Sequence, residues 1–133
     1  MYLAALDSEK KHLFRDLEIY MSNIDGDFSD KEKEIINLHC VEMHIDNNNF
    51  KCEYSLDEIY TRMKENMSVQ EKHIIFLELT ATILADEIYH EKEREMVEKL
   101  SSILCISDAE INEAFTIIRD MKSVYERCAA FVK

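Results

Sequence analysis

The chain has 133 residues, the length of one domain that can bury its own core without disulfides or a structural metal. It has no proline and only one glycine, a composition that favours an all-α fold. Its net charge of −12 disfavours nucleic acid and anionic lipid surfaces as direct partners, because an acidic surface repels phosphate groups. Basic protein segments and hard cations are the better match.

The cysteines and the apolar segments of the sequence indicate in which cellular compartment the protein is expected. The four cysteines show no Cys-x-x-Cys spacing and no pairing with a closely spaced pair of histidines, so we expect free thiols in a reducing environment. The first residues lack the basic start and the long apolar run of a secretion signal. The most apolar segment, residues 74–85, is too short to span a bilayer and contains Glu78. We therefore expect a cytoplasmic protein with no direct membrane insertion.

The first part of the chain is expected to form a helical hairpin. Asp7 can cap a first helix that runs to about Asn23, because apolar residues recur there at helical spacing. The Asp-Gly turn at Gly26 then reverses the chain. Ser29 opens a second helix that ends near Ile45.

Ser-x-x-Glu capping boxes mark the start of that second helix and of three later ones. In such a box the serine oxygen accepts a backbone N–H, and the glutamate accepts the serine's own N–H. The boxes at Ser55, Ser68 and Ser107 predict helices that follow the polar seam at residues 46–49. The helix after Ser68 is apolar nearly all round, which predicts a position at the centre of the fold.

The acidic turn of the first hairpin recurs in altered form in the second half. Residues 24–36 (IDGDFSDKEKEII) correspond to residues 85–97 (ADEIYHEKEREMV), with His90 in place of the capping serine. A fifth helix follows this second turn, so about six helices are expected. The organisation is one domain, 1–133, with pseudo-repeated hairpins at about 7–45 and 68–106, a linker with a short helix at 46–67, and a C-terminal helix at 107–133.

The first acidic turn also resembles a known signature. Asp-Gly-x-x-Ser-x-x-Glu, between an amphipathic helix and an aliphatic pair, resembles the signature of the tellurite-resistance TerB family. The related TerB-like domain also occurs at the front of some membrane-anchored DnaJ-type co-chaperones. Residues 25–33 fit this signature, whereas the second copy has Glu87 for the glycine and His90 for the serine. Residues 104–110 resemble the family's ending to the second hairpin, so the resemblance covers about residues 7–115.

This resemblance implies an all-helical cytosolic interaction module without enzymatic activity, linked to responses to tellurite and other chemical stress. The expected partners are proteins, basic or membrane-associated. It also implies a divalent metal site, in which carboxylates of both turns converge if the hairpins fold face to face. Such oxygen ligands suit Ca²⁺, Mg²⁺ or Mn²⁺. By position the metal-binding acids are Asp25, Glu32, Asp86 and Glu93, with Asp27 and Glu87 as further carboxylates.

Spacing disfavours two other kinds of metal site. An EF-hand loop that begins at Asp25 needs a glycine at its sixth position and a glutamate at its twelfth. This chain has Asp30 and Ile36 there. The Glu-x-x-His pairs that begin at Glu9 and Glu87 do not both lie inside helices, as a di-iron carboxylate site requires.

The acidic residues also have a structural interpretation, which stays open beside the metal site. Glu32 and Glu93 occupy positions at which a carboxylate stabilises a helix start without any ion. The alternative functions are therefore a metal-dependent hydrolase that uses the same carboxylates, and a structural or regulatory domain without a ligand. His39 is interpreted as a packing residue. Glu78 is a carboxylate that needs a backbone donor, a lysine or an exposed edge.

Overall fold

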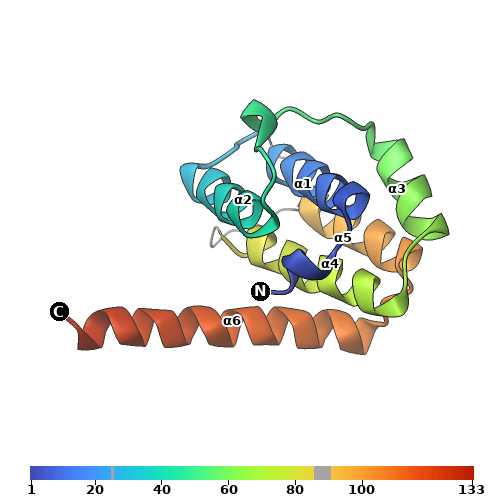
Figure 1. Cartoon of the computed structure of the whole chain (residues 1–133). Helices are drawn as coiled ribbons and strands as arrows, with labels where there is room; N and C mark the ends of the chain where they lie inside the picture. The colour runs from blue at the N-terminus through green and yellow to red at the C-terminus, as the bar shows by residue number, and fades with distance from the viewer. Residues whose placement is uncertain (25, 86–90) are drawn as a thin grey trace.

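The computed structural model describes residues 1–24, 26–85 and 91–133, and this part of the chain is all-helical (Figure 1). The predicted all-α class with about six helices is thereby confirmed. In chain order the elements are η1 (Leu3–Ala5), α1 (Ser8–Asn23), α2 (Asp30–Met43), η2 (Asn48–Phe50), α3 (Leu56–Glu65), α4 (Val69–Ile83), α5 (Glu91–Ile103) and α6 (Asp108–Phe131), where η denotes a 3₁₀-helix.

Side-chain caps start the helices at the predicted positions. Asp7 caps α1 by accepting a hydrogen bond from the backbone N–H of Lys10 at 3.0 Å. All four predicted Ser-x-x-Glu boxes are complete, and each serine cap contributes about 1 kcal/mol. The position that corresponds to Ser29 in the second hairpin, His90, lies outside the described residues.

Both hairpins close with a left-handed residue. α2 ends at Met43, slightly before the predicted end, because His44 has a φ of 55° and the next N–H bonds back to the carbonyl of Cys40 at 3.0 Å. Cys105 occupies the corresponding position after α5 and has a φ of 56°. The N–H that follows it bonds back to the carbonyl of Ser101 at 2.8 Å. This shared closure fits the predicted repeat of the hairpin.

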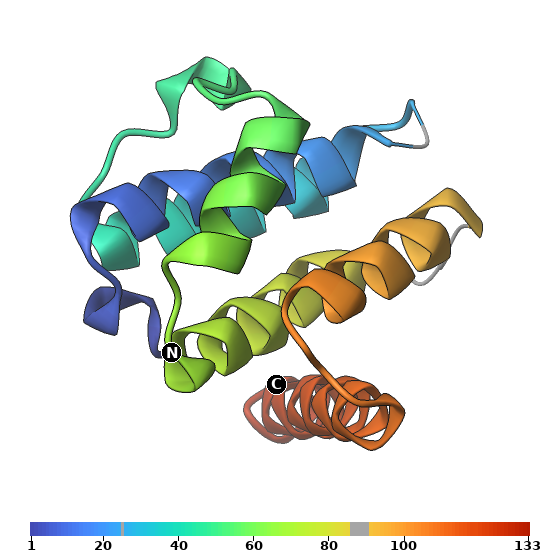
Figure 2. The same ribbon diagram turned by 90° about the vertical axis from the view of Figure 1, so that its right-hand side faces the viewer.

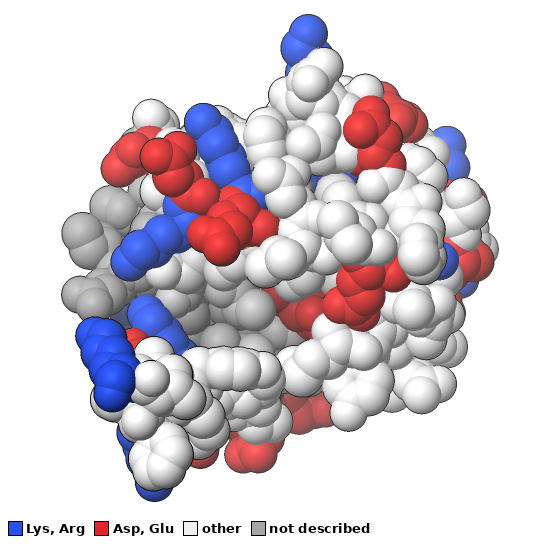
Figure 3. Space-filling view, turned by 60° about the vertical axis from the view of Figure 1, so that its left-hand side comes forward, with Lys and Arg blue, Asp and Glu red and all other residues white. Residues whose placement is uncertain are grey.

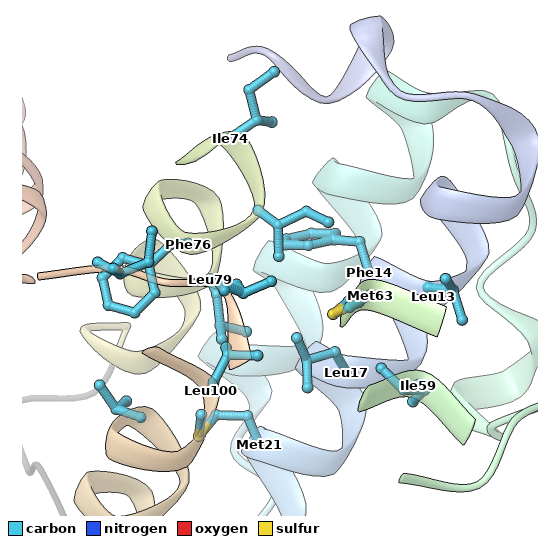
Figure 4. Packing of buried hydrophobic residues seen from close by; sticks show 14 of the residues in the cluster. Leu13, Phe14, Leu17, Met21, Ile59, Met63, Ile74, Phe76, Leu79 and Leu100 are labelled. Atoms are coloured by element: carbon cyan, nitrogen blue, oxygen red, sulfur yellow. The ribbon is translucent and has the colours of Figure 1, made fainter. Parts of the chain in front are cut away.

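The centre of the domain is formed by α1 and α4. α1 packs against α2, α3 and α4, whereas α4 packs against α1, α2 and α6, so the predicted central position of α4 is confirmed. Phe14 and Leu17 of α1 lie in one apolar cluster with Met63 of α3, Leu79 of α4 and Leu100 of α5 (Figure 4). Met43 of α2 and Phe115 of α6 belong to the same cluster, so all six described α-helices contribute to one core.

Two buried features have no counterpart in the predicted apolar pattern. The segment that contains η1 contacts α2 and α4 and buries Leu3 completely. α1 buries the charged residues Arg15, Asp16 and Glu18 together with its apolar side chains. Because a buried charge is costly unless it is paired, these residues require partners from other helices.

α6 lies across the rest of the domain. Its first half packs against α4 through Ala114, Phe115 and Ile118, and its C-terminal end projects past the body (Figure 1). Figure 2 views α6 along its axis and shows that only one side of it faces the other helices. In the part of the chain that the structure describes, no helix is long and apolar enough to cross a membrane.

Candidate functional site

A chain of polar side chains lies buried between α1, α2 and α4. His39 of α2 stands between two carboxylates, with Nδ1 at 2.8 Å from Glu18 Oε2 and Nε2 at 3.5 Å from Glu78 Oε2. The hydroxyl of Thr82 donates a hydrogen bond to Glu18 Oε2 at 2.9 Å. Glu18, Thr82 and Glu78 are at most 2% exposed, and His39 is 8% exposed. We call Glu18, His39 and Glu78 the Glu–His–Glu cluster.

Three packed helices bring these residues together. Glu18 lies one turn after Phe14 on α1, and the Phe14 ring packs against the imidazole of His39 with its centroid 5.5 Å away. His39 lies on the side of α2 that contacts α1 and α4. Glu78 lies between apolar neighbours on α4, the helix whose apolar sequence predicts a central position in the fold. The imidazole is therefore held by packing as well as by hydrogen bonds.

Burial and the neighbouring charges have opposite effects on the pKa of Glu18 and on the pKa of His39. Burial raises the pKa of Glu18, although the hydrogen bonds from His39 and Thr82 oppose this effect. Burial disfavours protonation of His39, but the hydrogen bond and charge of Glu18, with the charge of Glu78, raise its pKa above the ordinary 6.5. The pair therefore holds on to a proton at pH values where separate side chains would have lost it.

One oxygen of the cluster lacks a partner. Glu18 Oε1 is buried and has no hydrogen-bond partner among the described residues. A buried polar atom in this state costs about 1–3 kcal/mol.

Glu78 and Glu42 converge on the first residues of the chain. The amino group of Met1 lies 2.8 Å from Glu78 Oε1 and 2.9 Å from Glu42 Oε1. Glu78 also accepts a hydrogen bond from the backbone N–H of Tyr2 at 2.9 Å, and Glu42 accepts one from that of Leu3 at 2.9 Å. The expectation that Glu78 finds a backbone donor is confirmed, and the two carboxylates together hold a cationic group.

A groove of about 700 Å³ lies over this cluster, between α2, α4 and α6. Figure 3 shows a hollow between the ridge of α6 and the body of the domain, with both acidic and basic side chains at its edge. His39, Glu42 and Glu78 line one part of it, with Lys122 and Glu126 on α6. The apolar lining consists of Ile35, Leu38, Ala81, Leu84, Ala85, Ile118, Met121, Tyr125 and Ala129.

This combination is typical of binding sites. Ligand sites in helical proteins lie between helices, enclose about 300–1,000 Å³ and are mostly apolar, with a few convergent polar groups. Leu38 and Tyr125 on opposite walls are 61% and 69% exposed, so large apolar side chains are open to solvent at the rim. We therefore take the groove and the Glu–His–Glu cluster as the candidate functional site.

The predicted metal site is only partly visible. Asp25, Asp86 and Glu87 lie outside the described residues. Of the other predicted ligands, Asp27 is exposed, whereas Glu32 and Glu93 are 5% and 4% exposed. Glu32 Oε1 accepts the N–H of Ser29 at 3.0 Å, so this residue has the capping role that the structural interpretation expected.

The two hairpins nevertheless bend at the same end of the molecule. The end of α1 and the start of α2 lie beside the end of α4 and the start of α5 (Figure 2). A shared site in the two turns requires this arrangement. Within residues 1–24, 26–85 and 91–133, no group of three or more His, Cys, Asp or Glu residues could hold a metal ion. The metal site in the turns stays a prediction.

Sequence reasoning found only part of the candidate site. It identified Glu78 as a carboxylate in need of a partner, but it interpreted His39 as a packing residue and did not select Glu18 or Glu42. The one available signal was a charged residue within a segment that must be buried. That signal was clear on apolar α4 and hidden on α1, where several charged residues follow one another.

Comparisons with known proteins do not assign the chain to a family. No protein-family model matches the chain, and no curated protein and no solved structure is significantly similar to it. The function must therefore be argued from the geometry of the site.

Proposed function

We propose that this protein is a non-enzymatic interaction module that binds a basic amphipathic helix of a partner protein in the groove between α2, α4 and α6. The observation that carries the proposal is the groove itself, with solvent-exposed apolar walls and the polar side chains of His39, Glu42 and Glu78 on one part of its lining. A helix laid into an apolar groove between helices is a recurrent mode of peptide recognition.

Charge supports a basic partner. The chain carries a net charge of −12. The groove includes Glu42, Glu78 and Glu126 beside Lys122 and the amino group of Met1, which pairs with Glu42 and Glu78, so Glu126 and the charge of the whole chain provide the attraction. Complementary charge speeds the encounter between partners and disfavours acidic competitors. A helix with an apolar face and a lysine or arginine at its edge therefore fits the groove.

The chemistry of the cluster supports binding over catalysis. Both ring nitrogens of His39 face carboxylates, so neither is directed at a substrate in the groove. Burial raises the pKa of the neighbouring Cys40 thiol to about 12, which keeps it protonated and unreactive. These features do not provide an activated nucleophile or a free general base.

The resemblance to TerB-like modules agrees with this proposal. It stays a prediction, because it depends on the acidic-turn motif and the repeated hairpin. A link to chemical stress, a cytoplasmic location and a metal-dependent hydrolase as the alternative function are likewise untested predictions.

A displayed library of helical peptides tests the proposal without a known partner. We expect selection on the wild-type protein to yield amphipathic peptides with basic residues beside an apolar face. Leu38→Asp places a charge on the groove wall and should weaken their binding by about tenfold or more.

Val41→Asp is the matched control. Val41 is on the same helix and is 72% exposed, but it does not line the groove. We expect it to leave peptide binding unchanged. Peptides that bind wild type and Leu38→Asp equally well, or a selection that yields only acidic or non-helical peptides, would contradict the proposal.

A further inference from the structure

The second half of α6 has little contact with the rest of the chain. The helix has 24 residues and is therefore about 36 Å long. Its buried residues are Ala114, Phe115 and Ile118, all in the first half. An isolated helix of about 12–15 residues is only marginally stable in water. A partner that covers the projecting end of α6 would therefore stabilise its helical conformation.

A regular apolar stripe runs along α6 towards its exposed end. Apolar residues recur at alternating spacings of three and four, which is the a/d pattern of a coiled-coil seam. Val124 is 50% exposed and Phe131 is 90% exposed, so the later part of the stripe is open to solvent. The stripe consists of Ala114, which is buried, Ile117 and Met121, which are partly buried, and the exposed residues Val124, Cys128 and Phe131.

This stripe overlaps the groove wall only at Met121. Tyr125 and Ala129 line the groove, whereas Val124, Cys128 and Phe131 line a shallow hollow on another face of α6. Successive helical residues are rotated by about 100°, which places these two faces side by side on the helix. A partner on the stripe therefore does not have to enter the groove.

Charges beside the stripe are self-complementary. Asp120 and Arg127 each directly precede a stripe residue, Met121 and Cys128, so they lie on the same flank of the seam. In an antiparallel pair of identical helices this flank faces its own copy. Asp120 of one copy then lies opposite Arg127 of the other, twice in the pair.

The charge of the whole chain favours the same surface. From residue 119 onwards the side chains are four basic and two acidic, whereas the complete chain has a net charge of −12. A pairing at this segment avoids direct contact between the acidic bodies of the two molecules. The end of α6 is such a segment.

We propose that two copies of this chain associate through antiparallel pairing of α6, with the Ala114 to Phe131 stripe as the seam. The inference does not depend on the proposed function, because all seam residues except Met121 lie outside the groove. The seam is shorter than the three to four heptads typical of a permanent coiled coil, so the dimer is expected to be reversible and concentration-dependent.

Sedimentation velocity under reducing conditions tests this proposal. We expect the wild-type chain to pass from monomer to dimer as its concentration rises. Val124→Glu combined with Phe131→Glu should weaken the dimer by about 100-fold, since both side chains lie in the seam. Val41→Glu, an equally exposed apolar position on α2, should leave the dimer unchanged.

Charge reversal tests the antiparallel geometry. Asp120→Arg alone or Arg127→Asp alone should weaken the homodimer by about tenfold, and an equimolar mixture of these two variants should restore dimerisation. A wild-type chain that is monomeric at all concentrations would overturn the proposal. So would a dimer that survives the double glutamate variant, or a mixture that fails to recover. Peptide binding that persists in a monomeric seam variant separates this result from the proposed function.

Discussion

Two buried ionic clusters lie on α1 and differ in how completely they are paired. In the first, Asp16 Oδ2 accepts the backbone N–H groups of Glu53 and Tyr54 at 2.7 and 2.9 Å, and Oδ1 lies 3.2 Å from Arg15 Nε. Arg15 also donates to the carbonyl of Asp46 at 2.8 Å. These bonds fix the connector between α2 and α3 onto α1.

The Glu–His–Glu cluster has the opposite character. It contains two carboxylates and one imidazole, leaves Glu18 Oε1 without a described partner, and borders an open groove. The first cluster is saturated by the chain's own backbone, whereas the second can change its protonation and its contacts. The comparison teaches that burial of charge alone does not identify a functional site. Incomplete pairing beside a groove is the distinguishing feature.

The largest effect is expected from breaking the saturated cluster. Asp16→Ala leaves the Arg15 guanidinium buried with less compensation and two backbone N–H groups without an acceptor. We expect the free energy of unfolding to fall by about 3–5 kcal/mol. Urea denaturation measures this loss, with the exposed Asp120→Ala as the control. A loss of unfolding free energy no larger than that of an ordinary surface substitution would show that Asp16 does not have this structural role.

A smaller effect is expected when Glu18 is made neutral. Burial raises the pKa of Glu18, so the neutral and the charged forms of this side chain differ little in free energy. A glutamine has the same shape as the neutral form and should therefore replace Glu18 at low cost. We expect Glu18→Gln to cost about 1 kcal/mol, clearly less than Asp16→Asn in the saturated cluster. Equal costs in the same denaturation experiment would show that the two clusters do not differ in this way.

The pH dependence of stability separates the clusters further. The folded pKa of His39 is raised above 6.5, so its contribution to stability is complete below pH 6.5 and is lost as the pH rises through the folded value. Glu18 acts in the same direction, since its raised pKa favours the protonated form in the fold.

The groups that face His39 are Glu18 from α1, Glu78 from α4 and the amino group of Met1. We expect the difference in unfolding free energy between wild type and His39→Gln to shrink above pH 6.5. Urea titrations at a series of pH values measure it. A difference that is constant with pH would contradict the charged state of the imidazole.

The smallest effect is expected at a helix cap outside both clusters. Ser68→Ala removes the oxygen that accepts the N–H of Glu71 at 3.1 Å and should cost about 1 kcal/mol. Thermal unfolding measures it, with Ser68→Asp as the variant that restores a cap. This value sets the background against which the two clusters are compared. A cost as large as that of Asp16→Ala would show that the ranking is wrong.

The helices were predictable because their signals are local. Each capping box lies within four successive residues, so the starts of α2, α3, α4 and α6 follow from the sequence. The end of α2 was placed too late, because the left-handed turn occurs at His44 and no glycine marks it. The burial of η1 was not foreseen, since three residues carry no periodic signal.

The candidate site was less predictable because its contacts are distant in sequence. Glu18 and His39 are 21 residues apart and Glu18 and Thr82 are 64 apart, with no motif that links them. Glu78 was recognisable only because its neighbours are apolar. The groove depends on where α6 crosses α4, which no local pattern specifies.

The central claim is that the groove and the Glu–His–Glu cluster form one site, and the ring resonances of His39 test it most directly. NMR titration against pH should give a pKa above 6.5 for the free protein. Binding of a selected basic helical peptide should lower that pKa, because a cationic, desolvating neighbour disfavours the imidazolium. A His39 titration curve that is identical with and without bound peptide would contradict the claim.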